Sequence, residues 1–145
     1  MPKGINNLRV GDCAVTGNEY NYDYDYEDMY QDVMTFQAEI VEIKRKPSIP
    51  IGEQGMDAFG QVPVYEDRGV TKRALLACGR QDTDHTQLKP HDDKIIVLGS
   101  SSDHLLVDIE GSAEKYNVGD ILSFRMGYSA ILRANTSAYV RKVYV

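Results

Sequence analysis

The sequence predicts an all-β protein, folded as one β-barrel or sandwich-like domain. Short apolar segments of strand length recur at intervals of roughly 8–12 residues and are separated by glycine and proline. No segment carries the crossover helix of about ten residues or more that a parallel α/β sheet requires. The length of 145 residues suits a single domain. We divide it into a lead-in with an acidic, tyrosine-rich loop over residues 1–33, and a β-domain over residues 34–145.

The lead-in contains the unusual acidic segment Tyr20–Tyr30, in which tyrosines alternate with polar or acidic residues. A period of two suits an extended segment with one aromatic face. Because no apolar strand former anchors it, a loop with a short helical turn near residues 27–32 is an equal alternative. The segment could be an acidic patch for a metal or a partner, but we favour a solvated connecting loop.

The first strand of the β-domain is predicted over residues 34–44, where apolar and polar residues alternate and several are β-branched. Pro47 and Pro50 end it, because proline donates no hydrogen bond to a ladder. The glycine-rich residues 51–69 then predict a long loop or hairpin, with its turn at residues 57–60.

The remaining strands are expected at short spacing, each bounded by glycine or polar residues. A polar loop is expected over residues 82–93, and a helical period is visible only over residues 128–133. The predicted strands are residues 73–78, 94–98, 104–109, 121–125 and 140–145.

The charge balance and composition exclude several classes of protein. Sixteen basic against 22 acidic residues give a net charge of −6, and the basic residues are dispersed, which argues against nucleic-acid binding. No apolar run of about 20 residues exists, so no membrane span is predicted, and no signal peptide is visible. Cys13 and Cys78 are expected to be reduced thiols in a cytoplasmic protein.

Two stretches have the composition of a functional site. Residues 99–104 place three serines, an aspartate and a histidine directly after an apolar strand, and residues 78–82 place an arginine and an aspartate after another. A carboxylate and an imidazole side by side could orient each other or a ligand. A β-turn in which these side chains satisfy backbone N–H groups explains the first stretch equally well. The scattered histidines predict no metal site.

These two stretches resemble the C-terminal β-domain of fold-type III amino-acid racemases, which depend on pyridoxal phosphate. The likeness extends from about residue 4 to residue 144, and it is greatest to the alanine/ornithine racemase-like branch. The segments that carry it are Leu76–Asp82, Val97–Asp108, the turn Val118–Asp120, Arg141–Tyr144 and, for the branch, Lys46–Gly52, Asp57–Gly60 and Ser101–His104.

The resemblance implies a dimeric enzyme with two domains. A (β/α)8 barrel carries the lysine that forms the Schiff base with pyridoxal phosphate, and the β-domain of one subunit completes the active site of the other. A barrel needs about 200 residues or more, so this chain is expected to be inactive without a barrel domain or subunit. The implied substrate is an amino acid, with ornithine or another basic amino acid suggested by the branch.

Arg80 departs from the family pattern, because it stands where alanine racemases have a tyrosine that acts as a base. An arginine stays protonated in proteins and is a poor base, but its planar fork suits a substrate carboxylate.

The resemblance also assigns roles to other residues of this sequence. Arg80, Asp103 and His104 form the implied catalytic set, in which Asp103 lies near the substrate and His104 orients its neighbours. Ser101 and Ser102 join Arg80 and Asp103 as substrate-binding residues, and Ser102 replaces a methionine of the family. Tyr128 matches a tyrosine that hydrogen-bonds the phosphate of the cofactor.

Two other hypotheses compete with this one. The chain could be a stand-alone β-barrel that binds a partner protein or a small ligand without catalysis. It could also be a structural domain without a site, in which case Arg80 and Asp103 would point outward and fail to converge.

Overall fold

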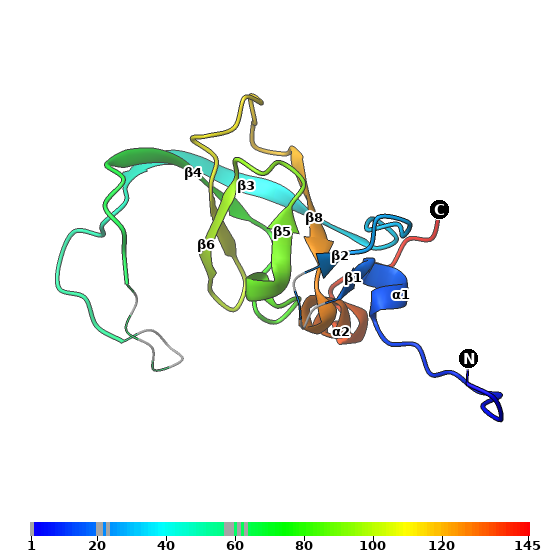
Figure 1. Ribbon diagram of the computed structural model, residues 1–145. Helices are drawn as coiled ribbons and strands as arrows, with labels where there is room; N and C mark the ends of the chain where they lie inside the picture. The colour runs from blue at the N-terminus through cyan, green and yellow to red at the C-terminus, as the bar shows by residue number, and fades with distance from the viewer. Residues whose placement is uncertain (1, 20–21, 23, 57–59, 61, 63) are drawn as a thin grey trace.

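The fold is built on one antiparallel sheet that curls into a nearly closed barrel (Figure 1). The structure is a computed structural model and describes residues 2–19, 22, 24–56, 60, 62 and 64–145. The sheet has six strands in the order β5-β8-β3-β4-β7-β6, and its edge strands β5 and β6 contact each other. The strands are β3 (Thr35–Pro47), β4 (Val70–Leu76), β5 (Leu88–Pro90), β6 (Ile96–Ser100), β7 (Leu105–Asp108) and β8 (Ile121–Met126). The expectation of an all-β barrel-like domain is confirmed.

Strand β3 is the central element of the sheet. Its first half pairs with β8 and its second half pairs with β4, and the register shifts between Ile40 and Glu42. Alternate side chains of the first half (Phe36, Ala38 and Ile40) point into the barrel and are buried. A strand with one buried face alternates in this way, so the period of two visible in the sequence is explained.

The barrel interior is filled by apolar side chains from all six strands of the sheet, and β6 contributes the partly buried Val97. Helix α2 (Tyr128–Thr136) closes one end of the barrel and buries Ala130 and Ala134, which lie one turn apart on the same helix face. The buried apolar residues of the strands are Phe36, Ala38, Ile40, Ala74, Leu76, Leu88, Leu105, Val107, Leu122 and Phe124. Across the described ranges, neither α2 nor any shorter helix has the length and apolar character to span a bilayer.

Two sequence predictions near the C-terminal half need correction. Residues 140–145 form no strand, and Val145 and Tyr144 are fully or almost fully exposed. The sheet therefore ends at β5 and β6, which contact each other across the seam of the barrel. The polar segment 82–93 is not only a loop, since it contains the 3-10 helix η2 (His85–Gln87) and strand β5.

The lead-in forms small local elements beside the barrel. Helix α1 (Cys13–Thr16) is followed by β1 (Asn18–Glu19), which pairs with β2 (Tyr24–Asp25) as a short ribbon. Residues 27–32 are turns and bends without the helical turn that was one alternative. Tyr20, the first residue of the predicted tyrosine-rich segment, lies outside the described residues. The division of the chain at residue 33 stays a prediction.

A long segment between β3 and β4, residues 48–69, projects from the barrel, and we call it the arm (Figure 1). Its root is clasped by Ser48, whose Oγ donates to Asp67 Oδ1 at 3.1 Å and accepts from the Arg68 N–H at 2.7 Å. The Ser48 N–H also donates to the Gly69 carbonyl at 2.7 Å. The turn predicted at residues 57–60 falls largely outside the described residues, which include only Gly60 of it.

Candidate functional site

Two loops at one end of the barrel carry most of the residues that the sequence singles out. The first, residues 79–84, follows β4 and is organised by the carboxylate of Asp82, which is buried. Asp82 Oδ2 accepts a hydrogen bond from the Gly79 N–H at 2.9 Å, and its Oδ1 accepts one from Ser137 Oγ at 3.3 Å. Asp82 is therefore a structural residue of this loop, since both of its oxygens hold neighbouring chain segments.

The second loop, residues 100–104, joins β6 to β7 and is held by Ser101. The Ser101 N–H donates to the His104 carbonyl at 2.9 Å, while its Oγ accepts from the N–H groups of Asp103 at 3.3 Å and His104 at 3.0 Å. This is the serine-capped turn that the sequence offered as one explanation. The side chains of Ser102, Asp103 and His104 are exposed, and Ser102 Oγ donates to Asp103 Oδ2 at 3.1 Å.

The two loops are bonded to each other through their backbones. The Arg80 N–H donates to the Ser101 carbonyl at 2.9 Å, and the Gln81 N–H donates to the Ser102 carbonyl at 3.2 Å. The approach is so close that a Cβ on Gly79 would lie 2.1 Å from the Ser102 carbonyl oxygen. A glycine is required there because its neighbour is backbone, which cannot swing away. The structure therefore brings the Arg80 and Ser101–Asp103 segments together.

The Arg80 side chain lies along the second loop rather than pointing freely into solvent. It is half-buried, and its Nε donates to the Ser100 carbonyl at 3.2 Å. The carbonyl of Arg80 in turn lies 3.5 Å from Nη1 of Arg133 on helix α2. Arg80 is thus fixed between the end of β6 and α2, with its guanidinium at the junction of the two loops.

Two further residues at this junction, His85 and Arg133, were not found by sequence reasoning, and they lie beside Ser100 of the predicted serine stretch. His85 Nδ1 lies 2.9 Å from Ser100 Oγ. Burial lowers the pKa of His85, the positive charges of Arg80 and Arg133 lower it further, and only the carboxylate of Asp84 opposes them. The sequence carried no signal for this cluster, because its members are far apart along the chain and the segment of His85 reads as an ordinary polar loop.

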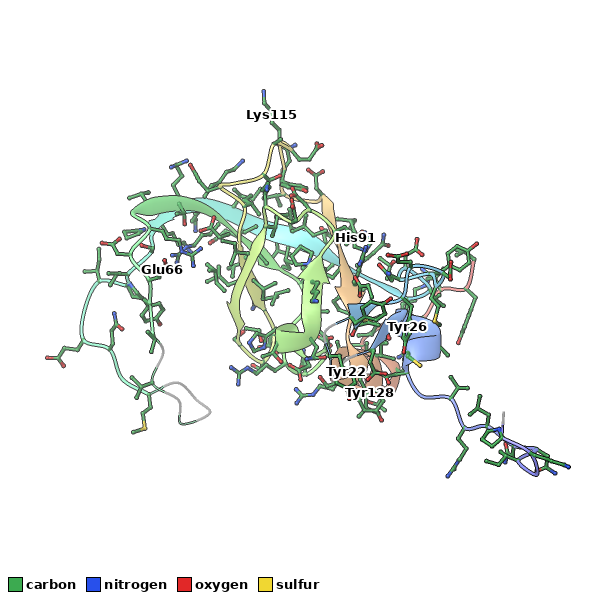
Figure 2. The ribbon with its side chains drawn as sticks, in the orientation of Figure 1. Tyr22, Tyr26, Glu66, His91, Lys115 and Tyr128 are labelled. Atoms are coloured by element: carbon green, nitrogen blue, oxygen red, sulfur yellow. The ribbon has the colours of Figure 1, made fainter. Side chains whose placement is uncertain are left out.

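Tyr128 lines a neighbouring cavity of about 450 Å³ rather than the junction of the two loops. It is the first residue of α2, and the preceding Gly127 packs so tightly that a Cβ there would meet Gln87 Oε1 at 2.1 Å. Lys89 and Arg125, which are paired across β5 and β8, line the same cavity. Figure 2 shows Tyr128 at the end of the molecule where the lead-in also lies.

The acidic residues of the lead-in complete this cavity. Asp12 and Asp25 line it, and Asp25 accepts a hydrogen bond from Asn18 at 2.8 Å and lies 3.9 Å from Arg125 Nη1. Arg125 also donates to Gln31 Oε1 at 3.0 Å. The wall from the lead-in is therefore acidic, whereas the wall from the barrel is basic.

Cys78 does not have the properties of a nucleophile. Both cysteines are free thiols, and Cys78 is buried. Burial raises the pKa of the Cys78 thiol to about 12, with the Asp82 carboxylate adding to the effect, so the thiol is protonated at neutral pH. Within the described residues, no group of three or more His, Cys, Asp or Glu side chains could hold a metal ion.

Comparison with known proteins relates the chain to amino-acid racemases. It is 54% identical to the ornithine racemase of Acetoanaerobium sticklandii over 98% of its own length, and 42% identical to the lysine racemase of Thermotoga maritima over 99%. The chain spans 40% of the length of each of these relatives. No family model matches the sequence.

Solved alanine racemases are among the structures with a similar chain path. The alanine racemase of Bartonella henselae is described as having covalently bound pyridoxal phosphate. It aligns with 70% of this chain, over 28% of the Bartonella chain, at a TM-score of 0.44 and 17% identity. The alanine racemase of Oenococcus oeni aligns with 84% of this chain, over 34% of the Oenococcus chain, at a TM-score of 0.43 and 15% identity.

These identities show that almost the whole chain is similar to one part of amino-acid racemases. More particularly, that part belongs to an ornithine and a lysine racemase, and the resemblance to an alanine/ornithine racemase-like β-domain inferred from the motifs is confirmed. The roles assigned to individual side chains are taken up below.

Proposed function

We propose that this chain is the β-domain or small subunit of a racemase that acts on ornithine or lysine and uses pyridoxal phosphate. The observation that carries this is the identity of 54% and 42% to an ornithine and a lysine racemase over almost the whole chain. Because the chain spans 40% of each relative, the remaining part supplies the barrel and the lysine that holds the cofactor. Without that part, the chain is inactive.

We assign the phosphate of the cofactor to the barrel-side wall of the cavity around Tyr128, which lies opposite the carboxylates of Asp12 and Asp25. A phosphate dianion is recognised by hydroxyl and cationic donors, and Tyr128, Lys89 and Arg125 bring one hydroxyl and two cations to one cavity. The adjacent N-terminus of α2 adds a favourable dipole. When bound, the cofactor serves as the electron sink for the substrate carbanion.

At the junction of the two loops, Arg80 and Asp103 complement the two charges of an amino acid. Arg80 is positively charged and binds the α-carboxylate, and the exposed carboxylate of Asp103 accepts hydrogen bonds from an ammonium group. Ser101 and Ser102 shape this pocket, and Ser102 adds a hydroxyl beside Asp103. His104 closes the loop through its backbone and orders its neighbours. Arg80, always protonated, is not the base that moves the α-proton.

The partner of this surface is the barrel domain or subunit. We propose a cytoplasmic homo- or hetero-oligomer in which the two loops meet the barrel of a second subunit. This is supported by the exposure of Ser102, Asp103 and His104, which contact mainly their own loop and leave their outer faces uncovered in the 145-residue chain.

The test combines this chain with a racemase barrel that carries the cofactor lysine and measures ornithine and lysine racemisation by polarimetry. The chain alone should be inactive, and the complex should be active. Arg80→Ala should lower kcat/KM by roughly 100-fold, which corresponds to about 2.7 kcal/mol of transition-state binding. Arg45→Ala, which removes an exposed ion pair with Glu110, is the matched control and should leave kcat/KM unchanged. An active complex that tolerates Arg80→Ala would reject the role of Arg80.

A second candidate function is amino-acid binding without catalysis. It is favoured by one observation, the fixed and always charged Arg80 at the position where related alanine racemases have a base. This candidate predicts that calorimetry detects ornithine binding to the complex, while no racemisation occurs at any barrel-to-chain ratio.

A further inference from the structure

The main chain of Ser100 at the end of β6 holds the Arg80 guanidinium group. Its carbonyl accepts the hydrogen bond from Arg80 Nε at 3.2 Å. The strand is irregular just before this point, because its register against β7 shifts between Val97 and Gly99. A bulge of this kind re-aims the residues that follow it, so the ladder alone fixes the direction of the Ser100 carbonyl less firmly than in a regular strand.

His85 provides the additional restraint on Ser100. Its Nδ1 lies 2.9 Å from Ser100 Oγ, so the Ser100 residue is held from two sides, by His85 at its side chain and by Arg80 at its carbonyl. His85 is itself well placed to act as an anchor. It begins the 3-10 helix η2, whose N-cap Asp84 accepts hydrogen bonds from Thr86 and from Ser129 of α2.

The charges around His85 favour a neutral ring. Element η2 packs against α2, which contributes Arg133, and against β6, which contributes no charged side chain. The preceding loop contributes Arg80, and Asp84 is the one nearby carboxylate that opposes these two cations. A neutral imidazole with an unprotonated Nδ1 can accept the Ser100 hydroxyl proton in a hydrogen bond without adding a third positive charge.

We propose that His85 is a positioning residue for Arg80, which acts through Ser100 to hold the guanidinium where it meets the substrate carboxylate. The inference rests on the proposed function only in naming that carboxylate. The mechanical link from His85 to Ser100 to Arg80 is a property of the chain itself, and it can be tested without the barrel or the cofactor.

The first test follows the Arg80 Nε–Hε signal by ¹⁵N NMR in the 145-residue chain. His85→Ala should shift this signal toward that of a solvated arginine and speed its exchange with water by tenfold or more. His85→Asn should restore most of it, because an asparagine amide can replace Nδ1 and is always neutral. Ser100→Ala should match His85→Ala, and the double variant should add nothing further, as expected for residues that act in series. His91→Asn, at an exposed histidine beyond β5, is the control.

The second test measures KM and kcat in the complex with the barrel and pyridoxal phosphate. His85→Ala should raise KM about tenfold with kcat nearly unchanged, and His85→Asn should return KM to within threefold of the wild type. An Arg80 signal that does not change in His85→Ala, or that changes equally in the alanine and asparagine variants, would overturn the inference. If the NMR link holds but Arg80→Ala leaves KM unaffected, the proposed role of Arg80 fails instead.

Discussion

The two loops at the end of the barrel and the arm between β3 and β4 are both irregular chain, but they are held in different ways. The loops are bonded to each other through two backbone hydrogen bonds, from Arg80 to Ser101 and from Gln81 to Ser102, and the buried Asp82 carboxylate holds the first loop from within. The arm is bonded at its root, around Ser48, and beyond that Ile51 and Val64 are more than nine-tenths exposed. Irregular backbone is therefore expected to be most stable in this protein where its polar groups find protein partners.

The largest expected effect comes from the closest approach between the loops. Gly79→Ala should destabilise the chain by about 3 kcal/mol, because its Cβ would overlap the Ser102 carbonyl. Gly55→Ala in the arm is the matched control, since a Cβ there meets nothing within 4 Å, and it should lie within about 0.5 kcal/mol of the wild type. Urea denaturation measures both. Equal losses at the two positions would remove the contrast between the loops and the arm.

The next effect concerns the carboxylate that organises the first loop. Asp82→Ala should cost about 2 kcal/mol, because the buried Gly79 N–H loses its acceptor and Ser137 loses a partner. Asp82→Asn should recover part of this loss, since its amide oxygen can still accept from Gly79. Thermal unfolding at neutral pH compares the three proteins, and a variant as stable as the wild type would show that the loop is held by its backbone alone.

A smaller effect is expected at the root of the arm. Ser48→Ala should cost about 1 kcal/mol, because the Arg68 N–H and Asp67 both lose the Ser48 hydroxyl. The arm should then be cut faster by a protease of broad specificity, while the barrel resists. If cleavage in the arm does not change, the clasp does not restrain it.

The smallest effect is a dependence of stability on pH at His85. The folded-state pKa of His85 is below its unfolded value of 6.5, so the unfolded chain binds more protons below that pH. Its contribution to stability is complete above pH 6.5 and is lost as the pH falls. Urea midpoints between about pH 7.5 and pH 5, above the range in which most carboxylates titrate, should show this decline. In His85→Asn the decline should become shallower, and an unchanged slope would contradict the assignment.

The strands were predictable where buried apolar residues alternate with exposed polar residues along the sequence. Residues 34–44 alternate so regularly that their strand was evident, and the apolar residues of 121–125 mark β8 nearly to its ends. Strand β5 was missed because it has only three residues, of which Leu88 alone is buried. Residues 140–145 have a strand-like composition, but composition does not reveal whether a segment finds a strand to pair with, and this one pairs with none of the six.

The candidate site was predictable only where its residues belong to short motifs of consecutive residues. The segments of Arg80 and Asp103 each follow an apolar strand, and their motifs resemble those of racemases, so both could be singled out. The pairing of His85 with Ser100 depends on the curl of the sheet, which brings η2 to the end of β6. The cavity that Tyr128 lines likewise depends on where the lead-in packs.

The clasp at Ser48 has a consequence for how such domains diverge. It closes the arm into a loop whose two ends are tied together before the chain enters the barrel, and the β3–β4 ladder begins directly behind it at Pro47 and Val70. The entropy of closing a flexible loop grows slowly, by about 0.6 kcal/mol for each doubling of its length. Insertions and deletions beyond Ser48 would therefore cost the barrel little, and descendants of this chain can acquire a longer or shorter arm while the loops at the other end keep their geometry.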